Sequence, residues 1–314
     1  MEIITVSSSN SALGNSQVTN FYLDKSYQFP SPAKLNLFLH IVGQRPDGYH
    51  DLQTLFQFLN YGDTITITPT HENKITLLTE FKGVPEESNL IVKAAKILQQ
   101  HSKTSFGAQI SIDKILPMGG GLGGGSSNAA TVLLALNSLW QTNISTNELA
   151  KMGLALGADV PIFIHGFAAF AEGVGEQLTP VEPSEHWYLV TKPNISIATA
   201  AVFTAKDLTR NTPKITFTDD NITDNLDNLQ NDCQTWVIKH HPEVAKLLAW
   251  LVEYAPSRMT GTGACIFSRF ASEHEAIAVK NQLPKNTYSF IAQGINTSPL
   301  IQAINDLPVK GMTN

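Results

Sequence analysis

Six of the seven residues from 119 to 125 are glycine, and a helical pattern follows over residues 129–139. Glycine has no Cβ atom, so its backbone can approach an anion closely and can adopt left-handed torsions without strain. The N-terminus of a helix adds N–H groups without a helical partner and a partial positive charge. Because a strand-like segment precedes the run, a flexible linker is disfavoured. The pattern predicts a phosphate-binding loop.

Three common glycine-rich loops fit this run poorly. The spacing of Gly119, Gly121 and Gly124 matches the dinucleotide-binding fingerprint, but no strand ending in an acidic residue follows about 20 residues later. The Walker pattern requires a lysine directly after its glycines, and none stands there. The protein-kinase motifs His-Arg-Asp and Asp-Phe-Gly are absent from the sequence. A nicotinamide-dependent dehydrogenase is therefore disfavoured.

Two charged residues could act on a bound phosphate. Lys34 begins the polar side of an alternating segment, and Asp159 lies between an expected helix and an apolar stretch. Each has an ordinary explanation as well, since a strand lysine is usually solvated and an aspartate before a helix is usually an N-cap. Ser126 and Ser127 are also N-cap residue types at the expected helix start. Taken singly, these residues leave both explanations open.

The elements that would position these residues are mixed strands and helices, which favours the α+β class. Alternation over 33–42 predicts a strand whose apolar face carries Leu35, Leu37, Leu39 and Ile41. Further strands are expected over 52–58, 63–68, 108–113, 188–190 and 195–197. Helices are expected over 90–100, 146–156, 230–240 and 242–254.

The chain has 314 residues, a length that suggests two domains. We expect a flexible N-terminal extension over 1–28, one domain over 29–180 and a second over 181–314. The net charge of −6 disfavours a nucleic-acid polymer as partner. Two cysteines give neither a disulfide framework nor zinc spacing, which fits a reducing cytoplasm. No stretch reaches the roughly 18 apolar residues of a membrane span, and residues 1–28 lack the pattern of a secretory signal.

Three segments resemble, in the right order, the three motifs of the superfamily of galactokinase, homoserine kinase, mevalonate kinase and phosphomevalonate kinase (the GHMP kinases). They are PAKLNL at 32–37, the glycine run with its flanks at 117–127, and TGTGAC at 260–265. Within the superfamily, segments 43–50, 156–161, 171–176 and 254–258 are most similar to the 4-diphosphocytidyl-2-C-methyl-D-erythritol kinases. The resemblance extends from about residue 29 to residue 300.

The resemblance implies a two-domain fold. Its N-terminal ATP-binding domain is similar to the second domain of ribosomal protein S five, and its C-terminal domain is ferredoxin-like. It also implies ATP-dependent phosphorylation of the 2-hydroxyl of 4-diphosphocytidyl-2-C-methyl-D-erythritol in non-mevalonate isoprenoid biosynthesis. Mg²⁺ is expected with ATP, with Ser127 as a candidate contact and no carboxylate that stands out as a ligand. We expect a monomer or weak dimer in the cytoplasm, with a small-molecule substrate and no membrane partner.

The resemblance also implies roles for individual residues. Asp159 would accept the hydroxyl proton, and Lys34 would keep that carboxylate ionised and orient the nucleophile. Residues expected to bind ATP are Asn89, Lys114, Pro117, Met118, Gly119, Gly120, Gly121, Leu122, Gly123, Gly124, Gly125, Ser126 and Ser127. Residues expected to bind the substrate are Asn36, Tyr49, His50, Val174, Thr199, Phe203, Thr262 and Gly263.

The cytosine would stack on Tyr49, with Phe203 as the second wall, and His50 would read its edge largely through the backbone. Thr262 and Gly263 would close the cleft near the transferred phosphate. Two alternatives stay open: another GHMP kinase of the homoserine or mevalonate type, and a non-catalytic ligand sensor on the same fold. The aromatic segment at Tyr49 disfavours the first, and the presence of both Lys34 and Asp159 disfavours the second.

Overall fold

The computed structural model describes residues 21–81, 83–216, 218 and 226–308. Its strands are β1 (Tyr27–Gln44), β2 (His50–Thr70), β3 (Ile75–Leu77), β4 (Gly107–Asp113), β5 (Ala169–Glu172), β6 (Gln177–Pro180), β7 (Trp187–Lys192), β8 (Ser257–Met259), β9 (Ile266–Phe270) and β10 (Tyr288–Ile295). Its α-helices are α1 (Leu90–Ser102), α2 (Gly124–Leu139), α3 (Thr146–Leu156), α4 (Val160–His165), α5 (Thr199–Phe203), α7 (Asp232–His240), α8 (Pro242–Leu251), α9 (Glu273–Lys280) and α10 (Pro299–Asn305).

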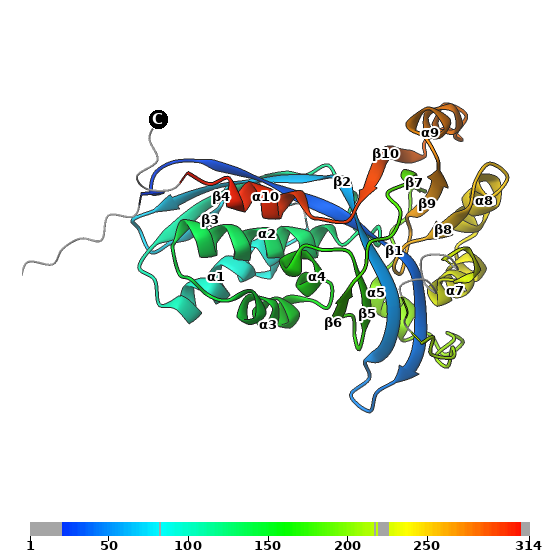
Figure 1. Ribbon diagram of the computed structural model, residues 1–314, viewed down its shortest axis with the longest axis horizontal. Coiled ribbons are helices and arrows are strands. Elements are labelled where there is room, and N and C mark those ends of the chain that lie inside the picture. Colours follow the sequence, from blue (N-terminus) through cyan, green and yellow to red (C-terminus); the bar gives the residue numbers. More distant parts are fainter. Residues whose placement is uncertain (1–20, 82, 217, 219–225, 309–314) are drawn as a thin grey trace, which may run out of the picture.

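A long antiparallel hairpin connects the two halves of the molecule. Strands β1 and β2 pair from Tyr27 opposite Ile67 to Gln44 opposite His50. The sheet order is β3-β4-β2-β10-β7-β9-β8, with β1 and β5 also paired to β2. In Figure 1 the blue ribbons of this hairpin run from the N-terminal half at the left to the C-terminal half at the right. Residues near the start of β1 therefore belong to one half of the molecule, and residues near the hairpin turn between β1 and β2 belong to the other.

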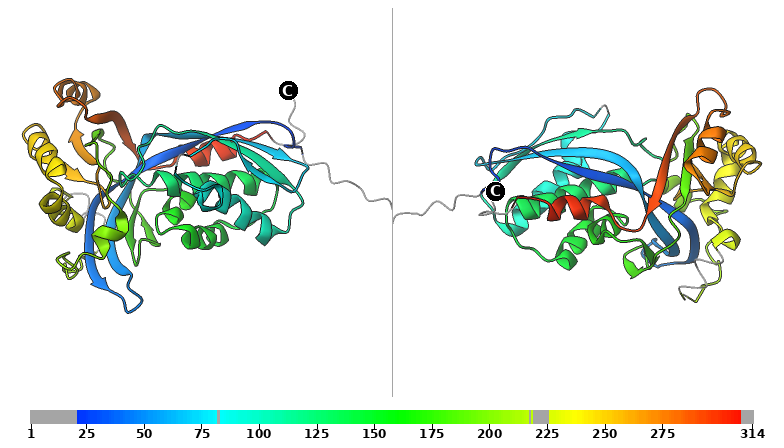
Figure 2. Two further views of the ribbon diagram at one scale, coloured as in Figure 1. Left: turned by 180° about the vertical axis from the view of Figure 1, so that it is seen from behind. Right: turned by 45° about the horizontal axis from the view of Figure 1, so that its top comes forward.

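Helices α1 to α4 cover one face of the N-terminal part of the sheet, as the two views of Figure 2 show. Helix α2 lies at the centre, and Ala129, Ala130, Val132 and Leu133 are all fully buried. They pack in one core with residues of β2, β4, α1 and α3. Burying apolar surface in this way is the main source of stability, at about 25 cal/mol per Å². The packing holds the glycine loop, which leads into α2, against a rigid support.

The C-terminal half has its own core beneath α7, α8 and α9. A third cluster lies between the halves and contains Leu122 of the glycine run together with Cys265, Phe267 and Phe290. The described helices include none that is both long and apolar enough to cross a membrane.

The two ends of the described chain differ from the expected division into domains. Tyr22 is buried in the N-terminal core and β1 begins at Tyr27, so residues 21–28 belong to the folded domain. Residues 1–20 of the expected extension lie outside the described residues. At the other end, α10 returns to the N-terminal half, where Leu300 joins the same core, and Figure 1 shows it beside α2. The boundary near residue 180 stays a prediction.

Several elements agree with the sequence-based expectations. Helix α3 has the expected bounds, with a capping box between Ser145 and Glu148 at its start and Gly157 after its end. Helix α1 begins after Asn89, whose side chain accepts a hydrogen bond from the Ile91 N–H. The expected strands over 52–58 and 63–68 are one strand, β2, and 195–197 is not a strand.

The expected single apolar face of β1 was wrong. Lys34 is 2% exposed and Phe38 is fully buried, so the opposite face is as enclosed as Leu35 on the first. The cause is a second layer: Phe38 stacks on Phe170 of β5, and the Lys34 N–H donates to the Leu122 carbonyl. The alternation therefore predicted the strand correctly, but it did not predict that the face with Lys34 and Phe38 is also covered.

Candidate active site

A cavity of about 840 Å³ lies where the hairpin, the glycine loop and the second glycine loop meet. The expected site residues that line it are Lys34, Asn36, Tyr49, His50, Asn89, Lys114, Pro117, Met118, Gly119, Gly120, Gly121, Leu122, Gly123, Gly124, Gly125, Ser126, Asp159, Val174, Thr199, Phe203 and Thr262. Ser127 and Gly263 are not among the described lining residues. Residues from both halves thus share one cavity.

The glycine run leads directly into α2, which begins at Gly124 after Gly123 in a left-handed conformation, φ 71°. The first N–H bond within the helix is that from Ser127 to the Gly123 carbonyl, at 2.8 Å. The N–H groups of Gly124, Gly125 and Ser126 therefore precede the helical ladder, and these residues line the cavity. Backbone donors at the positive end of a helix dipole favour a bound phosphate there.

The helix starts earlier than the sequence pattern indicated, which rules out the alternative that Ser126 and Ser127 are N-caps. Both residues lie inside the first turn of α2. Ser127 points inward, is 1% exposed, and its Oγ lies 2.9 Å from Ser31 Oγ. This inward direction also removes the support for Ser127 as a contact to Mg²⁺, whereas Ser126 lines the cavity.

The second glycine loop holds the first in place. The Cys265 N–H donates to the Gly120 carbonyl at 3.1 Å, and the Thr260 hydroxyl donates to the Gly121 carbonyl at 3.4 Å. The two loops also pack closely, because a Cβ atom on Gly121 would lie 2.2 Å from the Thr260 carbonyl oxygen. Gly263 faces Met259 and Ile197, so its contribution is to this packing.

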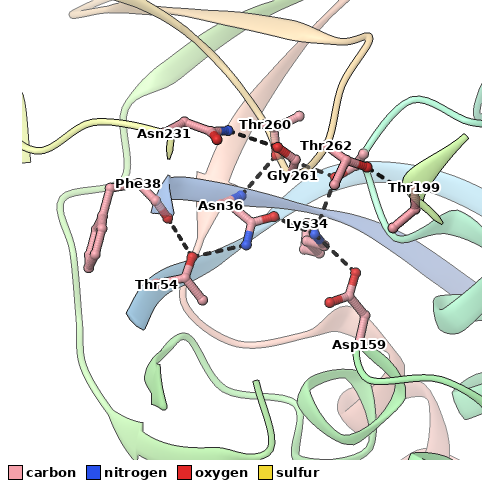
Figure 3. Close-up of polar contacts among 11 residues, drawn as sticks. Lys34, Asn36, Phe38, Thr54, Asp159, Thr199, Asn231, Thr260, Gly261 and Thr262 are labelled. Carbon is pink, nitrogen blue, oxygen red and sulfur yellow. Dashed lines mark hydrogen bonds and ion pairs between the residues drawn. The ribbon is translucent and has the colours of Figure 1, made fainter. Parts of the chain in front are cut away.

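Lys34 and Asp159 form an ion pair at the floor of the cavity. The Lys34 Nζ lies 3.1 Å from Asp159 Oδ2, and it also donates to Asn36 Oδ1 at 2.5 Å and to the Gly121 carbonyl at 3.2 Å. Figure 3 shows the ammonium between the two side chains. The Asp159 side chain is 36% exposed, against 2% for Lys34. The ammonium is thus held by the protein while the carboxylate stays open to the cavity.

The ordinary explanation for each of these residues was wrong. Lys34 is buried rather than solvated. Asp159 occupies the N-cap position of α4, but its side chain makes no capping hydrogen bond to the described first turn of that helix. A buried ammonium is costly unless it is paired and hydrogen-bonded, and here three oxygen atoms surround it.

Asn36 links β1 to the second glycine loop. Its side-chain amide donates to Thr54 Oγ1 at 2.9 Å, and the Thr54 hydroxyl donates to the Phe38 carbonyl. Its backbone N–H donates to Thr260 Oγ1 at 2.9 Å, as Figure 3 shows. With Oδ1 on Lys34 and the amide on Thr54, the Asn36 side chain mainly fixes the position of the ammonium.

Lys114 lies beside the start of α2 on a buried polar network. Its Nζ is 2.5 Å from Asp63 Oδ2, and a Cβ atom on Gly124 would lie 3.1 Å from the same nitrogen. The Asp63 side chain is fully buried. It also accepts hydrogen bonds from Asn128 Nδ2 at 2.9 Å and from two backbone N–H groups. Lys114 thereby brings a fixed positive charge to the place where the glycine loop would hold a phosphate.

The other end of the cavity is aromatic. Tyr49 is 62% exposed, while His50 is buried and stacks on Phe203 with ring centroids 5.1 Å apart. The Arg210 Nε donates to His50 Nε2 at 3.0 Å. Burial and, secondarily, the charge of Arg210 lower the pKa of His50 below its usual value. The imidazole is therefore neutral near pH 7.

Comparisons with known proteins agree with this geometry. The family model described as GHMP kinases N terminal domain matches residues 89–167, and the one described as GHMP kinases C terminal matches residues 220–289. A 4-diphosphocytidyl-2-C-methyl-D-erythritol kinase of Colwellia psychrerythraea is 62% identical over 290 residues, which are 92% of this chain and 97% of that protein. The chain belongs to this kinase family. A second member, from Pasteurella multocida, is 56% identical over 88% of this chain and 92% of its own length.

Solved structures support the fold of this kinase family. The crystal structure of a 4-(cytidine 5'-diphospho)-2C-methyl-D-erythritol kinase matches with a TM-score of 0.75 at 27% identity, over 85% of this chain and 98% of that one. A homoserine kinase from Cytophaga hutchinsonii matches with a TM-score of 0.61 at 14% identity, over 91% of this chain and 98% of its own. The second match concerns the fold alone. The expected two-domain GHMP kinase fold of the α+β class is confirmed.

Some residues of the site were missed by sequence reasoning. Phe81, Val84 and Leu90 give the cavity an apolar wall beside Asn89, and Phe56 lies beneath Lys34 with its ring centroid 5.2 Å from the Nζ. Thr260 and Arg210 were also missed. Apolar residues such as Phe81, Val84 and Leu90 look like core residues in a sequence. The contact partners that give these residues a role are distant in the chain.

Among the described residues, no cluster of three or more histidine, cysteine, aspartate or glutamate side chains could hold a metal ion. In the reaction centre, the Asp159 carboxylate is engaged with Lys34 through Oδ2.

Proposed function

We propose that this kinase transfers the γ-phosphoryl group of ATP to the 2-hydroxyl of 4-diphosphocytidyl-2-C-methyl-D-erythritol, in non-mevalonate isoprenoid biosynthesis. The observation that carries the proposal is a single cavity that joins a phosphate loop, the Lys34–Asp159 pair and an aromatic wall at Tyr49. The named relatives agree with the reaction. They do not favour the homoserine or mevalonate alternative.

The proposed chemistry starts at Asp159. Its carboxylate would accept the proton of the 2-hydroxyl while that oxygen forms a bond to the γ-phosphorus and the bond from this phosphorus to the leaving ADP oxygen breaks. Positioning and charge stabilisation supply most of the catalysis in phosphoryl transfer. Lys34, 3.1 Å from the carboxylate, would favour the developing negative charge on the attacking oxygen.

The phosphates of ATP would lie along the glycine loop. The N–H groups of Gly124, Gly125 and Ser126 in the first turn of α2 would bind them, and Lys114, paired with Asp63, would add a positive charge. The adenine would occupy the apolar wall formed by Phe81, Val84 and Leu90. The γ-phosphoryl group would then face Lys34 and Asp159, on the far side of the loop from the base.

The cytosine would lie at the aromatic end, with Tyr49 and Phe203 on either side and Thr199 and Thr262 along the path to the reacting hydroxyl. Thr199 Oγ1 and Thr262 Oγ1 are 3.0 Å apart, so α5 meets the second glycine loop there. His50 would contribute through its backbone groups. We further propose that the enzyme works in the cytoplasm as a monomer or weak dimer.

The stacking role of Tyr49 can be tested by replacing it with alanine. An aromatic stack on a base contributes roughly 1–3 kcal/mol, so Tyr49→Ala should raise the KM for the cytidyl substrate about tenfold while kcat and the KM for ATP stay near the wild-type values. Steady-state kinetics with each substrate varied in turn would measure this. Tyr254→Ala is a matched control, because Tyr254 is 42% exposed but does not line the described cavity. An unchanged KM for the cytidyl substrate would reject the stack.

A further inference from the structure

The Arg210 guanidinium forms hydrogen bonds with both His50 and Phe203 at the aromatic end of the cavity. Its Nη2 donates to the carbonyl groups of Phe203 and Ala205, at 2.9 and 2.5 Å, and its Nη1 donates to the Leu208 carbonyl at 3.0 Å. Its Nε donates to His50 Nε2 at 3.0 Å. Three of these hydrogen bonds hold the guanidinium within its own segment at the end of α5 and after it, and the fourth joins that segment to the first residue of β2. Arg210 lies behind the lining residues rather than among those described at the cavity surface.

The chemistry of this contact fixes the protonation of the imidazole. A guanidinium group has donors and no acceptor, so a ring nitrogen that accepts from it carries no proton. The single proton of the neutral His50 ring is therefore on Nδ1. The ring is held flat against Phe203, with an interplanar angle of 29°, so Arg210 also determines the orientation of the aromatic wall.

In the part of the chain that the structure describes, Arg210 is the hydrogen-bond partner of this nitrogen. In the hairpin turn, Arg45 pairs with Asp51 at 2.7 Å, and Asp47 accepts from the Tyr49 N–H. Helix α5 carries no titratable side chain in its sequence TAAVF. Asp207 pairs with Lys239. Among the groups that shift the His50 pKa, Arg210 is the charged one, and it acts after burial in the same downward direction.

The segment that carries Arg210 is held in place by hydrogen bonds of Thr212. The Thr212 N–H donates to the Ile41 carbonyl at 3.1 Å, and the Thr212 hydroxyl donates to Asp232 Oδ2 at 2.7 Å. That carboxylate also accepts from the Ile41 N–H. The segment that carries Arg210 is thereby anchored to β1 and to the start of α7.

We propose that Arg210 is a positioning residue for the base-binding end of the site, which holds His50 as the neutral tautomer protonated on Nδ1 and locks its ring against Phe203. This proposal rests on the proposed function for the identity of the base. It extends that function by assigning substrate discrimination to a residue that does not touch the substrate. The conformation of the pocket is then set before binding, which reduces the entropy lost on association.

Three kinetic measurements test the proposal on the full-length enzyme. Arg210→Met should raise the KM for the cytidyl substrate about tenfold, because a charge-assisted hydrogen bond is lost, and leave kcat and the KM for ATP within about twofold. Arg210→Lys should rescue little, since an ammonium cannot reproduce the planar set of donors. Arg269→Met is the matched control, because the Arg269 guanidinium pairs with Asp227 outside the cavity.

The pH profile should separate positioning from a general structural effect. In Arg210→Met the pKa of His50 rises, because one of the two causes that lower it is removed. The KM of this variant for the cytidyl substrate should therefore begin to increase at a higher pH than the wild-type KM as the pH is lowered. A double mutant with His50→Asn should show a smaller effect than the sum of the single changes, because both act through one contact.

The tautomer can be read directly, without substrate. Nitrogen-15 NMR of the imidazole rings, with His50 assigned from the spectrum of His50→Asn, should show the His50 proton on Nδ1 in the wild type. In Arg210→Met, a fraction of the molecules should lack the proton on Nδ1. A wild-type ring protonated on Nε2 would overturn the proposal even if the enzyme phosphorylates the cytidyl substrate. Strictly additive effects in the double mutant, or an equal rise in KM for ATP, would also overturn it.

Discussion

Asp159→Ala is expected to lower kcat by a factor on the order of 10² or more, because general-base catalysis contributes about that much. Nucleotide binding should survive, since the glycine loop and Lys114 do not depend on this carboxylate for their contacts. Lys34 keeps its hydrogen bonds to Asn36 and Gly121, so the fold should persist. Single-turnover phosphoryl transfer and equilibrium binding of ATP would measure the two effects separately.

Two further variants make this result specific. Asp159→Asn keeps the shape of the side chain but accepts a proton poorly, so it should lose nearly as much activity as the alanine variant. Asp113→Asn removes an exposed carboxylate at the end of β4 and should leave kcat unchanged. Turnover near the wild-type rate in Asp159→Ala would remove this residue from the mechanism.

Gly121→Ala is expected to disrupt the glycine loop. Gly121 has φ 76°, and a Cβ atom there would lie 2.2 Å from the Thr260 carbonyl oxygen, which is backbone and cannot rotate away. Such strain costs on the order of 1–3 kcal/mol or more, so Tm should fall by about 5 °C and the KM for ATP should rise about tenfold. Thermal unfolding with and without ATP, together with kinetics, would measure both.

A second glycine provides the comparison. Gly43 lies in β1, and a Cβ atom there would have Asp51 Oδ2 as its nearest neighbour, at 3.7 Å, which is ordinary contact. Gly43→Ala should therefore change Tm little and leave the KM for ATP unaltered. If Gly121→Ala behaved like Gly43→Ala, the close packing of the two glycine loops would not describe the protein in solution.

Local signals in the sequence predicted those elements that local interactions determine. Helix α3 was predicted with both bounds because Ser145 and Glu148 form its capping box and Gly157 follows it. The start of α2 was predicted too late because its first turn contains Gly124 and Gly125, and glycine has a poor helix propensity. The run before this turn is held by a hydrogen bond from the Cys265 N–H of the second glycine loop to the Gly120 carbonyl. Local residue types could not indicate that tertiary contact.

The candidate site shows the same division. The residue types of the glycine run indicated phosphate binding, and the resemblance to the GHMP kinases implied that Lys34 lies near Asp159, as the structure has it. The sequence could not show that Ser127 points to Ser31 instead of the cavity. Arg210 was missed because a single arginine in a polar loop carries no pattern. Its role depends on where β2 begins in space, which is a property of the fold.

The most direct test of the central claim is ADP release from Mg·ATP by the purified protein, with 4-diphosphocytidyl-2-C-methyl-D-erythritol, mevalonate and homoserine as separate acceptors. A cavity with Tyr49, His50 and Phe203 at one end and the Lys34–Asp159 pair at its floor predicts release with the cytidyl acceptor alone. Release with mevalonate or homoserine instead would contradict the assignment of the aromatic end. No release with any acceptor, despite ATP binding, would contradict the assignment of Asp159 as a catalytic base and favour a ligand sensor.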